Sequence, residues 1–100
     1  MKRIGNLVYN EDKIAKLCEE NDISYLALFG SYLHGDNNKK SDIDLLVNFK
    51  KPLGLMKFSK VRNEISDAFN KRVDLVMTDA LHQGFKDDVI KDSVTLFQDA

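Results

Sequence analysis

Cysteine, proline and tryptophan are scarce in this chain. Its 100 residues include one cysteine, one proline and no tryptophan. A single thiol cannot form an internal disulfide, so we expect Cys18 to be a small buried side chain in a reducing, cytoplasmic protein. No segment approaches the ~18 apolar residues of a membrane span. The basic N-terminus is followed by no apolar stretch of a secretory leader, so we expect neither secretion nor contact with a membrane.

An excess of charge of one sign is lacking too. Fifteen Lys and Arg face sixteen Asp and Glu, a formal net charge of -1. Without an overall basic field, direct binding of nucleic acid is not expected. A chain of this length with 43% hydrophobic residues suffices for one core. We therefore expect a single minimal domain over residues 1–100 that works through one site or one surface.

The spacing of apolar residues predicts alternating helices and strands. Helices are expected over 11–21 and 55–70, and a last helix carries Leu81, Phe85 and Val89, with Thr78 and Asp79 as its cap. Strands are expected over 23–29, 42–49 and 73–77, a short helical turn over 30–35, and a final strand or terminal turn over 94–97. This order predicts an α/β (α+β) fold, a small mixed β-sheet with helices packed on one face and the other face open near its carboxylates.

Three carboxylates in strand-like surroundings carry the main chemical signal. Asp42 and Asp44 are two residues apart, so in a strand they point to the same side, and Asp74 joins them if its strand pairs beside theirs. Two carboxylates ~5 Å apart repel by roughly 3 kcal/mol at an effective dielectric of ~20, which a cation would relieve. Oxygen ligands without His or Cys select Mg²⁺ or Mn²⁺, and Mg²⁺ usually completes its coordination with substrate phosphate. The alternative is three separate, solvated residues at strand edges and turns.

Gly30 and Ser31 end one predicted strand and open the short helical turn. In this position backbone N–H groups and a hydroxyl can hold a phosphate, and glycine allows close approach. The alternative is a plain turn at the end of a strand. The pair gains weight because its strand is the natural neighbour of the strand with the two aspartates.

Together, Gly30-Ser31, ten intervening residues and Asp42-Ile43-Asp44 resemble the pattern of the nucleotidyltransferase superfamily that includes DNA polymerase beta and kanamycin nucleotidyltransferase. Val73-Asp74-Leu75-Val76 supplies the third carboxylate. The chain is most similar to the minimal, single-domain MNT branch, over residues 14 to 77. The resemblance implies the polymerase beta-like palm fold.

The resemblance also implies roles for the site residues. Gly30 and Ser31 would hold the triphosphate, while Asp42 and Asp44 would ligate the metal ions. Asp74 would complete the metal site and help deprotonate the attacking hydroxyl. The implied reaction is in-line attack on the α-phosphorus of a nucleoside triphosphate, with ATP as the expected substrate, Mg²⁺ or Mn²⁺ as cofactor and pyrophosphate as the leaving group.

One residue departs from the family pattern. Many relatives carry Arg where this chain has His34, and a histidine is a weaker, pH-dependent partner for phosphate. His34 fits a surface turn equally well. Lys39 and Lys40 could steer a triphosphate or form a solvated pair.

The resemblance further implies a partner. MNT proteins are typically encoded beside a small helical HEPN protein, and in characterised pairs the MNT antitoxin adenylylates a tyrosine of the HEPN ribonuclease toxin. A homo- or hetero-oligomer is compatible with this role. One alternative is a non-catalytic module that neutralises its HEPN partner by complex formation. Another is a free-standing transferase for a small-molecule or RNA hydroxyl.

Overall fold

A four-stranded sheet forms the centre of the computed structural model, which describes residues 1–99. Ala100, the last residue of the expected domain, lies outside this part. In spatial order the strands are β5 (Val73–Met77), β4 (Ile43–Phe49), β3 (Ile23–Phe29) and β6 (Val94–Gln98). Because β3 is antiparallel to β4 and β6, and β4 is parallel to β5, the sheet is mixed, as predicted. The segment 94–97 is thus a strand rather than a terminal turn.

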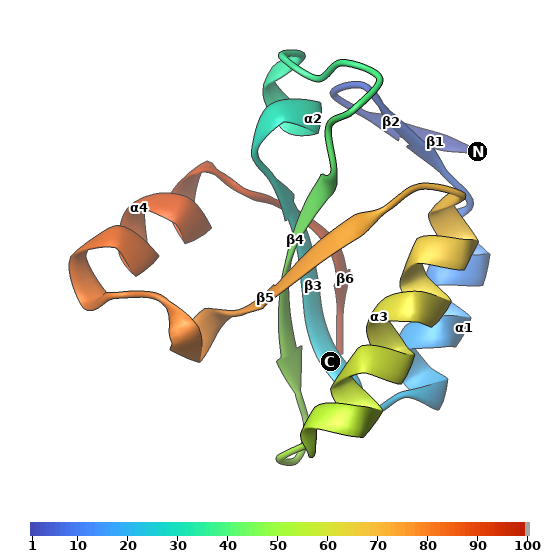
Figure 1. Ribbon diagram of the computed structural model, residues 1–100, viewed down its shortest axis with the longest axis vertical. Coiled ribbons are helices and arrows are strands. Elements are labelled where there is room, and N and C mark those ends of the chain that lie inside the picture. The colour runs from blue at the N-terminus through green and yellow to red at the C-terminus, as the bar shows by residue number, and fades with distance from the viewer. Residues whose placement is uncertain (100) are drawn as a thin grey trace.

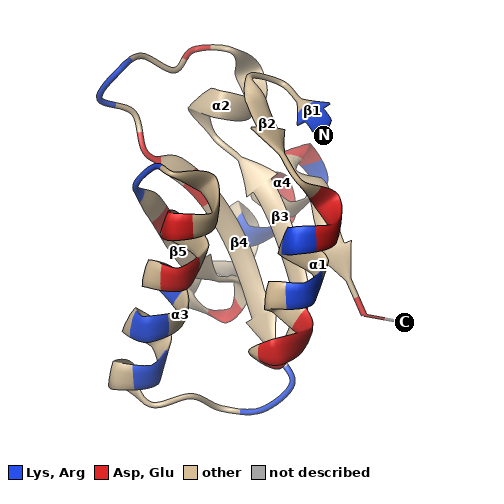
Figure 2. Cartoon of the chain, turned by 90° about the vertical axis from the view of Figure 1, so that its right-hand side faces the viewer, with Lys and Arg blue, Asp and Glu red and all other residues tan. Residues whose placement is uncertain are grey.

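Helices lie on both sides of this sheet (Figure 1). α1 (Glu11–Glu20) and α3 (Leu55–Phe69) lie on one face, and α4 (Gln83–Asp92) lies on the other. The prediction that the helices pack on one face therefore holds for α1 and α3 but not for α4. On the outer surface of α3 the Lys and Arg residues lie in the N-terminal half and the Asp and Glu residues in the C-terminal half, whereas in α1 the lysines lie between acidic ends (Figure 2). None of the helices within residues 1–99 is both long and apolar enough to cross a membrane.

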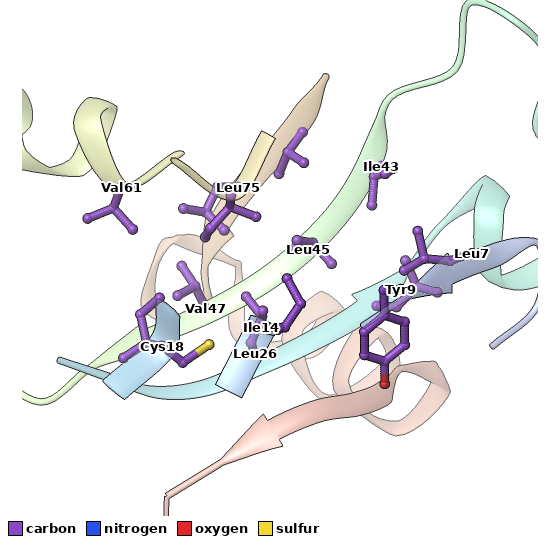
Figure 3. Packing of buried hydrophobic residues seen from close by; sticks show 14 of the residues in the cluster. Leu7, Tyr9, Ile14, Cys18, Leu26, Ile43, Leu45, Val47, Val61 and Leu75 are labelled. Carbon is purple, nitrogen blue, oxygen red and sulfur yellow. The ribbon is translucent and has the colours of Figure 1, made fainter. Parts of the chain in front are cut away.

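The hydrophobic core lies between the sheet and the pair α1 and α3 (Figure 3). Alternate residues of β4 enter it, because successive side chains of a strand point to opposite faces: Ile43, Leu45 and Val47 are at most 1% exposed. Cys18 of α1 is fully buried among them, as predicted. The pKa of its thiol is raised to about 12, mainly by burial and to a lesser extent by the charge of Glu19. This thiol is a packing group.

Three short elements complete the described chain: the hairpin β1 (Lys2–Ile4) and β2 (Leu7–Tyr9), the single-turn helix α2 (Ser31–His34), and the 3₁₀ turn η1 (Thr78–Ala80). The hairpin was not predicted. α2 confirms the expected helical turn.

The start of α4 corrects a second expectation. Thr78 and Asp79 do not cap the last helix but lie in η1, and α4 begins only after His82. The reason is that Thr78 is buried and its hydroxyl donates a hydrogen bond to Oδ1 of Asn48 on β4. A side chain held against the sheet in this way does not reach the first amides of α4, and that helix has no side-chain cap.

Candidate active site

The strand register places two of the predicted carboxylates beside each other. Asp44 on β4 is the direct partner of Asp74 on the parallel strand β5, and of Phe29 on the antiparallel strand β3. Paired residues of neighbouring strands point to the same face, with the strands about 4.8 Å apart. Asp74 therefore does lie beside Asp44, on the face of the sheet opposite the main core.

The Gly30 turn lies directly against Asp44. Gly30 follows the last residue of β3 and has φ +79°, a left-handed conformation that favours glycine. A Cβ built on Gly30 would collide with the carboxylate of Asp44. The two predicted motifs thus meet in space, and only a residue without a side chain permits that contact.

The carboxylate of Asp44 is poorly accommodated as an anion. Its pKa is raised above the ordinary value, first by desolvation on burial, then by the charges of Asp74 and Asp42. Asp74 is exposed, whereas Asp44 is half-buried. Both causes act against the ionised form, so a cation beside these oxygens would be favourable.

Asp42 has a different partner. Nε of Arg72 donates a hydrogen bond to Oδ1 of Asp42 over 2.9 Å. A backbone hydrogen bond holds Arg72 beside Asp42, since the amide of Ile43 donates to the carbonyl of Arg72 over 2.9 Å. Across residues 1–99, no three His, Cys, Asp or Glu side chains gather closely enough to form a ready metal centre. The structure thus pairs Asp44 with Asp74 and holds Asp42 with an arginine that the sequence analysis did not identify.

The turn after Gly30 is well anchored. The amides of Leu33 and His34 donate to the carbonyl of Gly30 over 3.1 and 3.3 Å. Tyr32 is buried in the core, and Nζ of Lys71 lies 5.9 Å from the centre of its ring. Ser31, the first residue of α2, is half-buried beside the same turn.

The last helix forms one wall next to this turn. A hollow of about 420 Å³ is lined by Phe29, Gly30, His34, Asp88, Val89 and Asp92. Nε2 of His34 lies 2.6 Å from Oδ2 of Asp92, so this imidazole, half-exposed, faces the end of α4. Sequence reasoning placed α4 away from the site, because a helix pattern does not reveal which face of the sheet the helix covers.

Comparisons with known proteins agree with this geometry. The family model described as "Polymerase beta, Nucleotidyltransferase" matches residues 12–100. Protein adenylyltransferase MntA of Thermococcus cleftensis is 33% identical over 79 residues, which cover 79% of this chain and 80% of that protein.

Solved structures show the same similarity. A toxin-antitoxin structure with AMP-PNP is 28% identical with a TM-score of 0.72, covering 90% of this chain and 74% of that one. A mutant of the toxin-antitoxin pair MntA-HpeT is 28% identical with a TM-score of 0.71, covering 92% of this chain and 75% of that one.

Proposed function

Because the chain belongs to the polymerase beta family of nucleotidyltransferases, we propose that it transfers AMP from ATP to a hydroxyl group of another molecule. Family membership implies a nucleotide substrate and a divalent metal ion; ATP and Mg²⁺ or Mn²⁺ are the proposed identities. The observation that carries the proposal is the contact of Asp44 with the Gly30 turn on one side and its pairing with Asp74 on the other.

The residues present fit a divalent ion by their chemistry. Asp42, Asp44 and Asp74 offer carboxylate oxygens, the donors that Mg²⁺ and Mn²⁺ prefer. The pKa of Asp44 is raised first by burial and then by the charges of Asp74 and Asp42, and a bound cation would offset both effects. When bound, the ion would lower the pKa of the attacking hydroxyl and neutralise charge on the phosphates.

The roles that we propose for the chain's own groups come from the family resemblance, and their positions support them. Gly30 and Ser31 would hold the triphosphate through backbone N–H groups and the serine hydroxyl. Asp74 is exposed at the edge strand, where an acceptor can reach it, and would help take the proton of the attacking hydroxyl. That oxygen forms a bond to the α-phosphorus as the bond to pyrophosphate breaks.

The proposed acceptor is a tyrosine hydroxyl of a HEPN toxin, with this chain as the antitoxin. Two similarities support this: the 33% identical relative is named a protein adenylyltransferase, and the 28% identical structures are of toxin-antitoxin complexes. The proposal places the acceptor on a separate protein that docks on the carboxylate face.

A transfer assay tests the proposal. Purified chain, its HEPN partner, Mg²⁺ and ATP labelled at the α-phosphate should yield labelled partner. The double variant Asp42→Ala with Asp44→Ala should yield none, while Asp67→Asn, an exposed acid on α3, serves as the matched control with full transfer. No label on the partner with the wild-type chain would end the proposal.

A non-catalytic binding module is the second candidate. The bond of Arg72 to Asp42 favours it, since that bond occupies a predicted metal ligand. The same double variant separates the two functions: if it still neutralises the toxin, complex formation suffices. If it binds the toxin without neutralising it, transfer is required.

A further inference from the structure

The N-terminal hairpin contacts the segment that joins the two halves of the site. It lies outside residues 12–100, which the family model matches. Leu7 and Tyr9 are both 4% exposed and join the core, and the ring of Tyr9 lies 6.1 Å from that of Phe69 at the end of α3. The hairpin is therefore anchored to the body of the domain, and its turn reaches α2 (Figure 1).

The turn of the hairpin, Gly5-Asn6, touches α2 through its backbone. Gly5 has φ +58°, and a Cβ there would collide with the carbonyl oxygens of Tyr32 and Leu33. The amide of Asn6 donates a hydrogen bond to the carbonyl of Tyr32 over 2.9 Å. The final carbonyls of a helix have no partner within it, so the hairpin supplies a donor that α2 cannot supply itself.

The side chain of Asn6 makes a second contact. Its Nδ2 donates to Oδ1 of Asn37 over 2.8 Å, in the loop between α2 and β4. That loop, residues 36–41, connects α2, which follows Gly30, to Asp42 and then to β4 with Asp44. A single residue thus holds both α2 and the loop that follows it. A helix of four residues is far too short to be stable alone.

We propose that Asn6 is a positioning residue: the hairpin turn fixes α2 and the 36–41 loop so that Gly30 and Ser31 are aligned with Asp44 for the nucleotide. This rests on the proposed function. The proposal gives a role to the N-terminal hairpin, which lies outside the part of the chain that the family model matches. The role concerns alignment of the nucleotide-binding turn and not contact with the reacting atoms.

Binding of ATP with Mg²⁺, measured by calorimetry, is the first readout. Asn6→Ala keeps the backbone hydrogen bond and removes the side-chain hydrogen bond. It should raise the Kd for ATP about fivefold, which corresponds to the loss of one ordinary hydrogen bond. Asn37→Ala should have the same effect, and the double variant should be no weaker than either single one. Asn6→Asp should restore binding, because the amide of Asn37 can turn and donate to the new carboxylate. Val8→Ala, on an exposed position of the same hairpin, is the matched control.

Hydrogen exchange of the Leu33 and His34 amides is the second readout. Both amides donate to Gly30 and should exchange severalfold faster in Asn6→Ala, while the amide of Ile65 on α3 is unchanged. A Kd and exchange rates within twofold of wild type in both single variants would overturn the proposal, as would a lower melting temperature with unchanged Kd. If the wild-type chain binds no ATP, the proposed function fails. Exchange at Leu33 and His34 then decides by itself whether the hairpin holds α2.

Discussion

The two faces of β4 serve different purposes. On the inner face Ile43, Leu45 and Val47 are buried against α1 and α3. On the outer face Asp44 carries a raised pKa between the Gly30 turn and Asp74. The inner residues stabilise the fold. The surroundings of Asp44 disfavour its ionised form, so this carboxylate lowers the stability of the fold unless a bound cation compensates its charge. Substitutions on the two faces should therefore have opposite effects on stability and activity.

The largest effect is expected from Asp44→Asn. Loss of a metal-binding carboxylate should reduce AMP transfer by on the order of 10³-fold, while the melting temperature without metal stays the same or rises, because a neutral amide removes the repulsion from Asp74. Transfer rates and thermal melts of the same preparation check this. Full activity, or a marked loss of stability, would show that Asp44 stabilises the fold and does not serve as a metal ligand.

Leu45→Ala tests the other face of the same strand. This side chain is fully buried, so its truncation should lower the free energy of unfolding by about 2–5 kcal/mol, measured by urea denaturation. Leu55→Ala is the control, since Leu55 is 82% exposed and should change stability by less than about 0.5 kcal/mol. Equal effects of the two variants would contradict the assigned core.

Gly30→Ala tests the contact between the Gly30 turn and the carboxylate of Asp44. The left-handed φ and the collision with Asp44 should cost roughly 1–3 kcal/mol of unfolding free energy and weaken ATP binding. Combined with Asp44→Ala, the same substitution should cost less, because the collision with the carboxylate is removed and only the strained φ and a tight 3.1 Å approach to the Cβ of residue 44 remain. A cost that does not depend on residue 44 would show that the two groups do not touch.

The smallest effect concerns pH. Because the pKa of Asp44 is raised in the folded protein, its contribution to stability is most favourable when it is protonated and declines as pH rises through the raised pKa. The melting temperatures of Asp44→Asn and wild type should therefore be similar near pH 3, below the ordinary pKa of an aspartate, and separate at pH 7, with Asp44→Asn the higher. A difference of the opposite sign would contradict the raised pKa.

Much of this arrangement could be predicted from the sequence. Alternation of apolar residues over 42–49 fixes which side chains enter the core, so Asp42 and Asp44 are expected on the outer face. The pairing of Asp74 with Asp44 required only that the next strand lie alongside, and the register confirms it. The family resemblance placed Gly30 in the same site.

Other features depend on tertiary contacts and could not be predicted in this way. The bond of Arg72 to Asp42 depends on where β5 begins relative to β4. Thr78 reads as a helix cap until its bond to Asn48 is known. The hairpin did leave a signal, since Gly5-Asn6 between apolar residues is typical of a two-residue turn, but strands of three residues are too short to show alternation.

The most direct test of the central claim is the melting temperature with and without millimolar Mn²⁺ and ATP. A ligand that binds only the folded state raises stability by mass action, so the wild-type melting temperature should rise. In Asp44→Asn and Asp74→Asn this rise should be lost, while Asp67→Asn keeps it. A wild-type melting temperature that does not move, or a rise that persists in both outer-face variants, would contradict a metal and nucleotide site at Asp44 and Asp74.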